Sequence, residues 1–273
     1  MSAAESVGLT MNGVVTRWNR IFFISVSVFA GWVGAWCYFV PSRADMAIPW
    51  LVPPLHARFI GALYLAGVVA MLLACGARRW IEVRIVTLLV GIWTGMLFLI
   101  TMLRLDDFDF GTARVWIWTG AYAYMPVVAV LFLRQGRLHR APDAAAPLTA
   151  PTRAGYALLG CALVVVAFAL LFFTDRTIRA WPWKIDPLLA QIYSGPFLAL
   201  GVMNLMIARS RAWMEVRIAV ATQAVFAMLV LVASLAHRSL FVGDRPASWF
   251  WFIGVAASIV LCGTTAFRGV RRA

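Results

Sequence analysis

The stretch Trp80-Ile81-Glu82-Val83-Arg84-Ile85 returns 133 residues later as Trp213-Met214-Glu215-Val216-Arg217-Ile218. The same offset aligns other uncommon residues without a gap: Pro49-Trp50 with Pro182-Trp183, Pro54-Leu55 with Pro187-Leu188, Arg78 with Arg211, and Trp116/Trp118 with Trp249/Trp251. A constant offset through so many rare residues is typical of an internal duplication, and such a period has to be recognised before a fold is assigned. The sequence therefore predicts two copies of one unit.

The composition places the chain among integral membrane proteins. Its 273 residues are 63% hydrophobic and 13% charged, with a mean hydropathy of +0.86, whereas a soluble domain carries about 25% charged residues. Eight apolar runs approach or exceed the roughly 18–20 residues that cross a bilayer as a helix. They lie near 21–40, 57–76, 82–103, 115–133, 155–174, 188–207, 214–236 and 248–267. We expect an all-α protein with eight transmembrane helices.

The distribution of the net charge of +13 predicts the orientation. If the N-terminus is cytoplasmic, that side of the membrane holds 15 of the 24 basic residues and only four acidic ones, Glu5, Glu82, Asp143 and Glu215. An excess of Arg in the cytoplasmic loops is the positive-inside bias of multi-pass proteins. We therefore expect both termini in the cytoplasm. The basic charge then requires no nucleic-acid partner.

The eight runs divide into two four-helix units. The first repeat covers residues 1–133, including a short cytoplasmic tail, and the second covers 154–273. Residues 134–153, rich in Pro, Ala and Arg, are expected to form a cytoplasmic linker. Because each unit crosses the membrane four times, the copies share one orientation. This is a parallel repeat, related by an axis along the membrane normal.

The repeated motif contains charges at both of its occurrences: Arg78, Glu82 and Arg84 in the first, and Arg211, Glu215 and Arg217 in the second. One interpretation is local, with Arg78 and Glu82 paired at i,i+4 and each Glu favoured in the first turn of a helix. The other pairs Glu82 with Arg217, and Glu215 with Arg84, between the copies, because a charge at that depth is costly unless it is paired. Both interpretations give these residues a structural role, and a cytoplasmic ligand or proton site stays a third possibility.

The outer loops carry a second group of candidates. We expect the acidic loop 104–110 to lie beside the loop 41–54, and this surface to be the place for a ligand or partner, because loops on rigid helices present polar groups that the bilayer excludes. The alternative is that tryptophans anchor the helices at headgroup depth and aspartates are solvated. The residues of this predicted outer surface are Trp50, His56, Arg58, Asp106, Asp107, Asp109 and Trp183.

Metal, cofactor and catalytic motifs are weak. The three aspartates only loosely resemble the diphosphate site of membrane prenyltransferases, since the other copy has Ser239-Leu240-Phe241-Val242 in their place. His56 and His237 align with Leu189 and Arg104, which argues against a haem pair. No phosphate-binding loop, nucleophile–base pair or metalloprotease motif is found. The sequence implies no metal, cofactor or catalytic residue and favours a non-enzymatic protein.

The middle of every expected helix is free of Asp, Glu, Lys and Arg. The deepest polar residues are Asn204, Gln223 and the threonines of the third helix. Ion-coupled carriers usually place ionisable groups at this depth, so a coupled transporter is disfavoured. Thr87, Gly91, Thr94, Gly95 and Thr101 fall on one face of the third helix, a pattern that predicts a close interhelical seam.

Three segments of the chain resemble those of a known group of membrane proteins. Residues 53–62 (PPLHARFIGA), 105–110 (LDDFDF) and 181–188 (WPWKIDPL) are similar to those of a group of uncharacterised bacterial multi-pass membrane proteins. The resemblance covers the outer loops and helix starts of both halves, about a third of the chain. It implies a location in the bacterial plasma (inner) membrane and supplies no activity or site residue.

Two classes of function remain. The protein binds or passes a lipid or small apolar molecule between its two repeats, or it is an accessory subunit that packs against other subunits of a larger membrane complex. An intramembrane enzyme that uses the outer aspartates is the third interpretation. Membrane lipids are the expected partners in each case.

Overall fold

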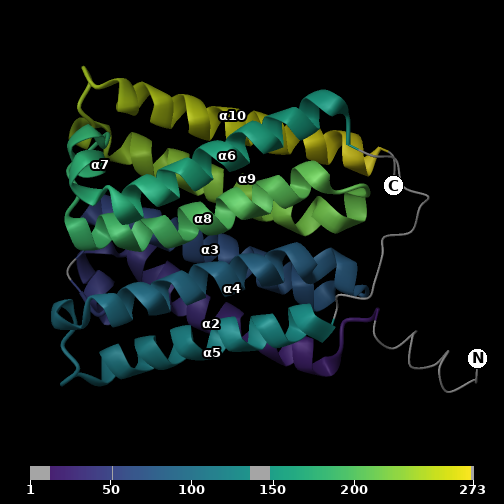
Figure 1. Ribbon diagram of the computed structural model, residues 1–273, viewed down its shortest axis with the longest axis horizontal. Coiled ribbons are helices and arrows are strands. Elements are labelled where there is room, and N and C mark those ends of the chain that lie inside the picture. Colours follow the sequence, from purple (N-terminus) through teal and green to yellow (C-terminus); the bar gives the residue numbers. More distant parts are fainter. Residues whose placement is uncertain (1–12, 51, 136–147, 272–273) are drawn as a thin grey trace, which may run out of the picture.

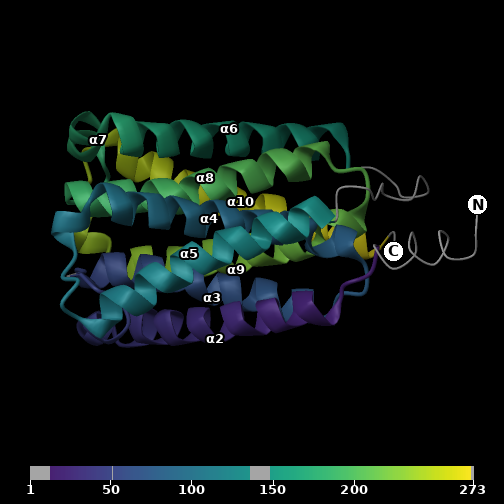
Figure 2. The ribbon, with the colours of Figure 1, turned by 60° about the horizontal axis from the view of Figure 1, so that its bottom comes forward.

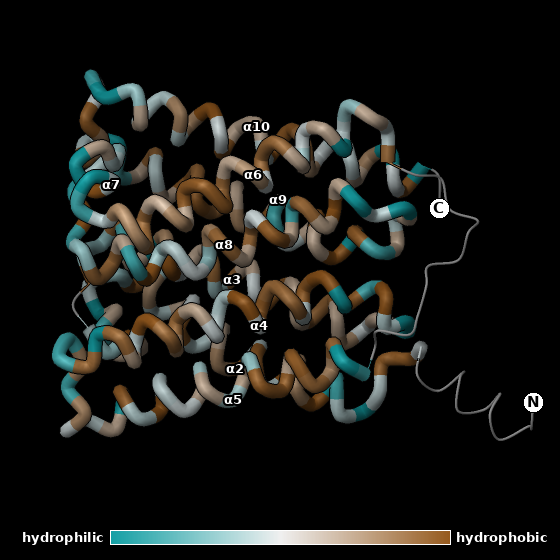
Figure 3. Tube along the Cα trace, in the orientation of Figure 1, coloured by the Kyte–Doolittle hydropathy of each residue, from teal (hydrophilic) through white to brown (hydrophobic). Residues whose placement is uncertain are grey.

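The computed structural model describes residues 13–50, 52–135 and 148–271. It is an all-helical bundle in which eight helices are long and apolar enough to span a membrane, as predicted. The first four are α2 (Arg17–Phe39), α3 (Pro54–Gly76), α4 (Trp80–Leu103) and α5 (Ala113–Gln135). The second four are α6 (Ala150–Phe172), α8 (Pro187–Arg209), α9 (Trp213–Ala236) and α10 (Pro246–Val270). Hydrophilic residues gather toward the two ends of the bundle (Figure 3).

The helix bounds recur at the offset of the sequence repeat. Adding 133 to the bounds of α2, α3 and α4 gives those of α6, α8 and α9, and α10 starts at the residue that corresponds to the start of α5. The helices also pack in matching pairs, α2 on α3 and α6 on α8, then α4 on α5 and α9 on α10. We call α2–α5 the first half and α6–α10 the second half.

The two halves lie side by side and meet along four central helices (Figures 1 and 2). Between the halves, α3 packs against α9, and α4 packs against both α8 and α9. Within each half the two central helices, α3 and α4 or α8 and α9, contact each other little. Each half is therefore completed by the other, and the hydrophobic core is continuous across the boundary.

Short elements connect the helices at the end of the bundle opposite the termini, which we call the α7 end (Figure 1). They are η1 (Pro41–Met46), η2 (Leu105–Asp107), η4 (Arg238–Leu240) and α7 (Thr174–Ala180). The segment 175–186, which lies between two of the predicted apolar runs, thus contains most of a short helix. We call the other end, where α2 begins and α10 ends, the termini end.

The region between the halves is shorter than predicted. The sequence suggested a linker over 134–153, but α5 continues to Gln135 and α6 begins at Ala150. Pro151 does not prevent this early start, because a proline in the first turn of a helix has no hydrogen bond to lose. Most of the remaining linker, with His139 and Asp143, lies outside the described residues.

The predicted seam on the third helix is present between α4 and α5. A Cβ at Gly91 would stand 3.1 Å from that of Ala129, and one at Gly95 would stand 3.4 Å from Pro126. The hydroxyls of Thr87, Thr94 and Thr101 each donate to the carbonyl four residues earlier. Small residues thus bring α4 and α5 together, and the polar groups of this face are satisfied within α4.

Candidate functional site

The charges of the repeated motif form two ion pairs between the halves. Arg217 donates to Glu82, and Nη2 of Arg84 lies 3.7 Å from Oε2 of Glu215. Both glutamates are buried, with 3% and 5% of their surfaces exposed. A buried carboxylate is costly unless a cation or hydrogen bond compensates it. The two pairs therefore fasten α4 to α9 at the termini end.

Glu82 pairs with Arg217 and not with Arg78, the partner in the local interpretation. The backbone N–H of Arg79 donates to Oε1 of Glu82 over 2.9 Å, which caps the start of α4. The other carboxylate oxygen is taken by Arg217. Arg78 and Arg211 are exposed, and the carbonyl of Arg78 accepts from the N–H of Val15.

The predicted outer surface does not form one accessible patch. His56 and Trp183 are buried, with 3% and 2% of their surfaces exposed. The His56 ring nitrogens hydrogen-bond the Tyr193 hydroxyl at 2.7 Å and the carbonyl oxygen of Lys184 at 3.0 Å. Trp183 packs against Trp251 with ring centroids 4.8 Å apart. These residues join α3 to the second half through aromatic and hydrogen-bonded contacts.

Arg58 forms a separate contact between the halves. Its Nη1 donates to Nε2 of His237, at the end of α9, over 2.6 Å, and its Nε donates to the carbonyl of Tyr38 over 3.3 Å. Burial lowers the pKa of His237, and the positive charge of Arg58 lowers it further. A neutral His237 is the form that can accept this hydrogen bond.

The acidic loop lies beside the loop 41–54, as expected. Phe108 packs edge-on against Trp50 with centroids 5.7 Å apart, and Arg114 donates to the carbonyl of Asp45. Trp50 also packs against Trp118. Trp50 and Trp183 are therefore packing residues, whereas Trp116 and Trp249 are 61% and 67% exposed and suit the headgroup region.

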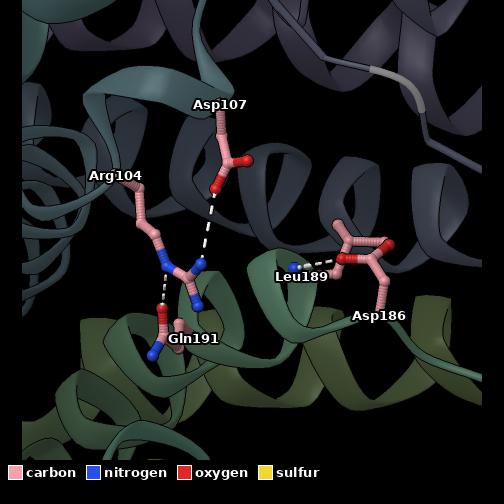
Figure 4. Close-up of polar contacts among 5 residues, drawn as sticks. All are labelled: Arg104, Asp107, Asp186, Leu189 and Gln191. Carbon is pink, nitrogen blue, oxygen red and sulfur yellow. Dashed lines mark hydrogen bonds and ion pairs between the residues drawn. The ribbon is translucent and has the colours of Figure 1, made fainter.

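The three aspartates of the acidic loop have different surroundings. Oδ2 of Asp107 lies 3.6 Å from Nη1 of Arg104. Nε of Arg104 also donates to Oε1 of Gln191 over 2.9 Å (Figure 4). Asp109 accepts from the backbone N–H of Gly111, and Asp106 is exposed. Within the described residues no three His, Cys, Asp or Glu side chains are grouped as metal ligands. Arg104, at the end of α4, thus connects the acidic loop to α8. Nearby, Asp186 caps the start of α8 by accepting from the backbone N–H of Leu189 (Figure 4).

A large cavity lies inside the second half. It has a volume of about 460 Å³ and is bounded by α6, α7, α8, α9 and α10. Aliphatic and aromatic side chains make up most of its wall, among them Leu163, Val166, Phe197, Phe226, Val230 and Trp251. Small-molecule sites are typically concave and mostly apolar, with a few polar groups.

The arrangement of α6 and α10 gives the cavity its open side. Near the termini end they are joined, since Tyr156 donates to the hydroxyl of Thr265 and Gly155 lies close to Leu261. They separate toward the α7 end (Figure 1). Exposed residues of both helices, Ala162 and Phe250, line the cavity there. Because these two residues are exposed, the cavity is open between α6 and α10.

The corresponding space in the first half is filled with aromatic side chains. The residues at the positions of Ala162 and Val255, 133 residues earlier, are Phe29 and Tyr122, whose rings pack 6.0 Å apart. The Tyr122 hydroxyl hydrogen-bonds that of Tyr64, and Tyr64 packs on Trp93. A cavity on the boundary with the second half, beside these rings, measures only about 10 Å³. The two halves thus differ in whether this space is occupied by their own side chains.

Four of the side chains that line the cavity carry a hydroxyl or an amide: Thr177 of α7, Asn204 of α8, Gln223 of α9 and Ser258 of α10. Gln223 donates from Nε2 to Ser258 over 2.9 Å, and Asn204 donates from Nδ2 to the carbonyl of Leu200 over 2.7 Å. Within the described part of the chain, both amide oxygens are buried without a hydrogen-bond partner.

Sequence reasoning recognised Asn204 and Gln223 only as deep polar residues and missed the cavity. It placed a ligand between the two repeats, where the structure is closely packed. A signal was present in the alignment of the repeat, in which small residues of the second half oppose large ones of the first: Ala162 and Phe29, Val255 and Tyr122, Ser258 and Met125. A loss of volume at several positions of one copy indicates a cavity if those positions lie together in space.

Comparison of the chain with protein-family models, curated proteins and solved structures gives no significant match. The cavity and the contacts between the halves are therefore the basis on which a function can be inferred.

Proposed function

We propose that this multi-pass protein binds a lipid or a small apolar molecule in the cavity of its second half and is not an enzyme. The observation that carries the proposal is the difference between the halves. One fills the space between its outer helices with Phe29 and Tyr122, whereas the other has Ala162 and Val255 and leaves about 460 Å³ open. An empty apolar cavity costs contact energy in proportion to its volume, which an apolar ligand would restore.

The position of the gap supports entry from the membrane. It lies between α6 and α10, few of whose residues are buried in the isolated chain, so that both helices would contact lipid. A molecule dissolved in the hydrocarbon could enter sideways without crossing a polar surface. The ligand would then be recruited from the bilayer and not from water.

The test is to fill the cavity with the side chains of the first half. The double variant Ala162→Phe/Val255→Tyr, purified in lipid nanodiscs, should lose co-purifying small molecules that mass spectrometry detects with the wild-type protein. Ala257→Phe/Val260→Tyr is the matched control, because both residues are exposed on α10 and neither lines the cavity. Equal ligand content in the two double variants would contradict the proposal.

An accessory role in a larger membrane complex is the alternative. The same preparations would favour it if a second protein co-purified in fixed ratio with wild-type and cavity-filled protein alike. An intramembrane enzyme that uses Asp106, Asp107 and Asp109 is less well supported, because these side chains have separate surroundings.

We further propose that the chain is a duplicated four-helix unit in a bacterial plasma membrane, with both termini cytoplasmic. The matching helix bounds and the two exchanged ion pairs support the duplication. The Arg-rich termini end supports the orientation.

A further inference from the structure

The amides of Asn204 and Gln223 are unusual in a cavity so apolar. Their exposed fractions are 0% and 3%, and their NH₂ groups are already bonded within the protein. The two carbonyl oxygens are strong acceptors that have no donor in the described structure. In a membrane interior such groups are seldom left without a partner, because no bulk water can supply one.

The first half packs its corresponding helices without such amides. At the corresponding positions of the first half stand Met71 and Val90, which are apolar. A buried acceptor without a donor destabilises the folded protein, and the second half has two such acceptors where the first half has none at the corresponding positions. The amides are therefore better explained by a ligand that bonds them than by the stability of the bundle.

The remaining wall restricts the charge of that ligand. Among the described residues that line the cavity there is no Asp, Glu, Lys or Arg. An ion in this position would lack a counter-charge and would be very costly to desolvate. A neutral donor such as a hydroxyl can bond one of these oxygens at no such cost.

We propose that the cavity binds a neutral, largely hydrocarbon molecule that carries a hydroxyl group, and that this hydroxyl donates to the amide oxygen of Gln223 or Asn204. The inference rests on the proposed function and narrows its ligand to a class. Gln223 lies near the middle of the 24-residue helix α9. The polar group of the ligand is thus held deep in the membrane, a place that a phospholipid headgroup does not occupy.

A matched pair of probes tests this class. A photoreactive long-chain alcohol and its methyl ether share the hydrocarbon chain, and only the alcohol has a hydrogen to donate. With the wild-type protein in nanodiscs, we expect the alcohol to label cavity residues about tenfold more efficiently than the ether at limiting concentration, the effect of one buried hydrogen bond.

Two variants take their residues from the first half. Gln223→Val and Asn204→Met keep the cavity apolar, and together they should abolish the preference for the alcohol while labelling by the ether persists. Thr222→Val is the control, because Thr222 is equally buried, bonds the carbonyl of Ile218 and does not line the cavity. It should keep the preference. Thermal unfolding of each variant shows whether the fold is intact.

The outcomes separate the two proposals. Equal labelling of the wild-type cavity by alcohol and ether overturns the hydroxyl inference and leaves the apolar-ligand proposal standing. Persistence of the preference in a folded Gln223→Val/Asn204→Met variant also overturns the inference. Absence of cavity labelling by either probe overturns both.

Discussion

Glu82 of α4 is paired with Arg217 of α9, and the same contact is repeated with the helices exchanged, between Arg84 and Glu215. The offset of 133 converts Glu82 to Glu215 and Arg84 to Arg217, so each pair is the image of the other. The two contacts are not equally close: the second has a distance of 3.7 Å between Arg84 Nη2 and Glu215 Oε2. A residue pattern that repeats along the chain thus becomes a reciprocal contact between the halves.

The first prediction concerns the strength of this contact. Glu82→Gln and Arg217→Gln should each destabilise the protein in detergent by roughly 1–2 kcal/mol, because each leaves a polar or charged partner without its counterpart. The expected loss of stability is small because 44% of the Arg217 side chain is exposed, and solvent weakens an exposed ion pair. The measurement is unfolding of the single and double variants in a thermodynamic cycle.

The double variant should lose less unfolding free energy than the two single variants lose together, since the same contact is removed only once. Arg78→Gln is the control, because Arg78 is exposed and precedes the helix. Strict additivity of Glu82→Gln and Arg217→Gln would mean that the pair contributes nothing to the joining of the halves.

A second prediction concerns the close approach of α2 and α3. A Cβ at Gly61 would stand 2.6 Å from the backbone N of Tyr38, too close for any side chain. Gly61→Ala should force the helices apart and lower the free energy of unfolding by about 1–3 kcal/mol. Gly120→Ala has open space around its Cβ and should be neutral or slightly stabilising. Similar melting temperatures for the two variants would argue against this packing.

The sequence predicted those parts of the fold that depend on the length and composition of a segment. The apolar run 82–103 corresponds to α4 at Trp80–Leu103, and 57–76 to α3 at Pro54–Gly76. The starts extend farther because a proline or an interfacial tryptophan can open a helix before its apolar run begins. By contrast, α7 has Asp175, Arg176 and Arg179 within seven residues, and so short a charged helix leaves no hydropathy signal.

Features that depend on which helices touch could not be chosen from the sequence. Glu82 had two possible partners, Arg78 and Arg217, and only the packing of α4 on α9 selects the second. His56 and Trp183 belong to the predicted outer surface because they lie in or beside the outer loops, yet both are covered by aromatic residues of the second half. The cavity depends on side chains that are small at several distant positions, which no single segment reveals.

The third prediction is a dependence of stability on pH. Burial, followed by the charge of Arg58, lowers the pKa of His237 in the folded protein. The unfolded chain therefore takes up a proton at higher pH than the folded protein does. Stability should be fully present above about 6.5, the ordinary value for histidine, and should fall as the pH is lowered through the folded pKa. Melting temperatures of wild type and His237→Gln between pH 8 and pH 5 provide the measurement, and an equal acid sensitivity of the two would refute the role of His237.

The fourth prediction concerns orientation. Because the Arg excess lies at the termini end, a reporter that is active only outside the cytoplasm should remain inactive when fused after Arg140. Arg140 itself lies outside the described residues. The same reporter fused after Asp109, in the acidic loop, is the positive control and should be active. Activity after Arg140 would reverse the proposed topology.

The fifth prediction decides between the two interpretations of the acidic loop. Joint replacement of Asp106, Asp107 and Asp109 by Asn removes three charges from the acidic loop. The Arg104–Asp107 pair is 36% and 41% exposed, and such pairs contribute about 1 kcal/mol or less. The amide oxygen introduced in place of the Asp109 carboxylate can still accept from the N–H of Gly111. We therefore expect unchanged expression, a change in unfolding free energy below about 1 kcal/mol and the same co-purifying small molecules.

Arg104→Gln is the informative comparison, because Arg104 is the residue that reaches Gln191 of α8 from the end of α4. Its loss removes a contact between the halves and should destabilise the protein more than the triple replacement does. If the triple Asn variant instead lost its co-purifying molecules while the fold was retained, the ligand would be bound at the acidic loop. The cavity between α6 and α10 would then have to be regarded as a packing defect filled by lipid.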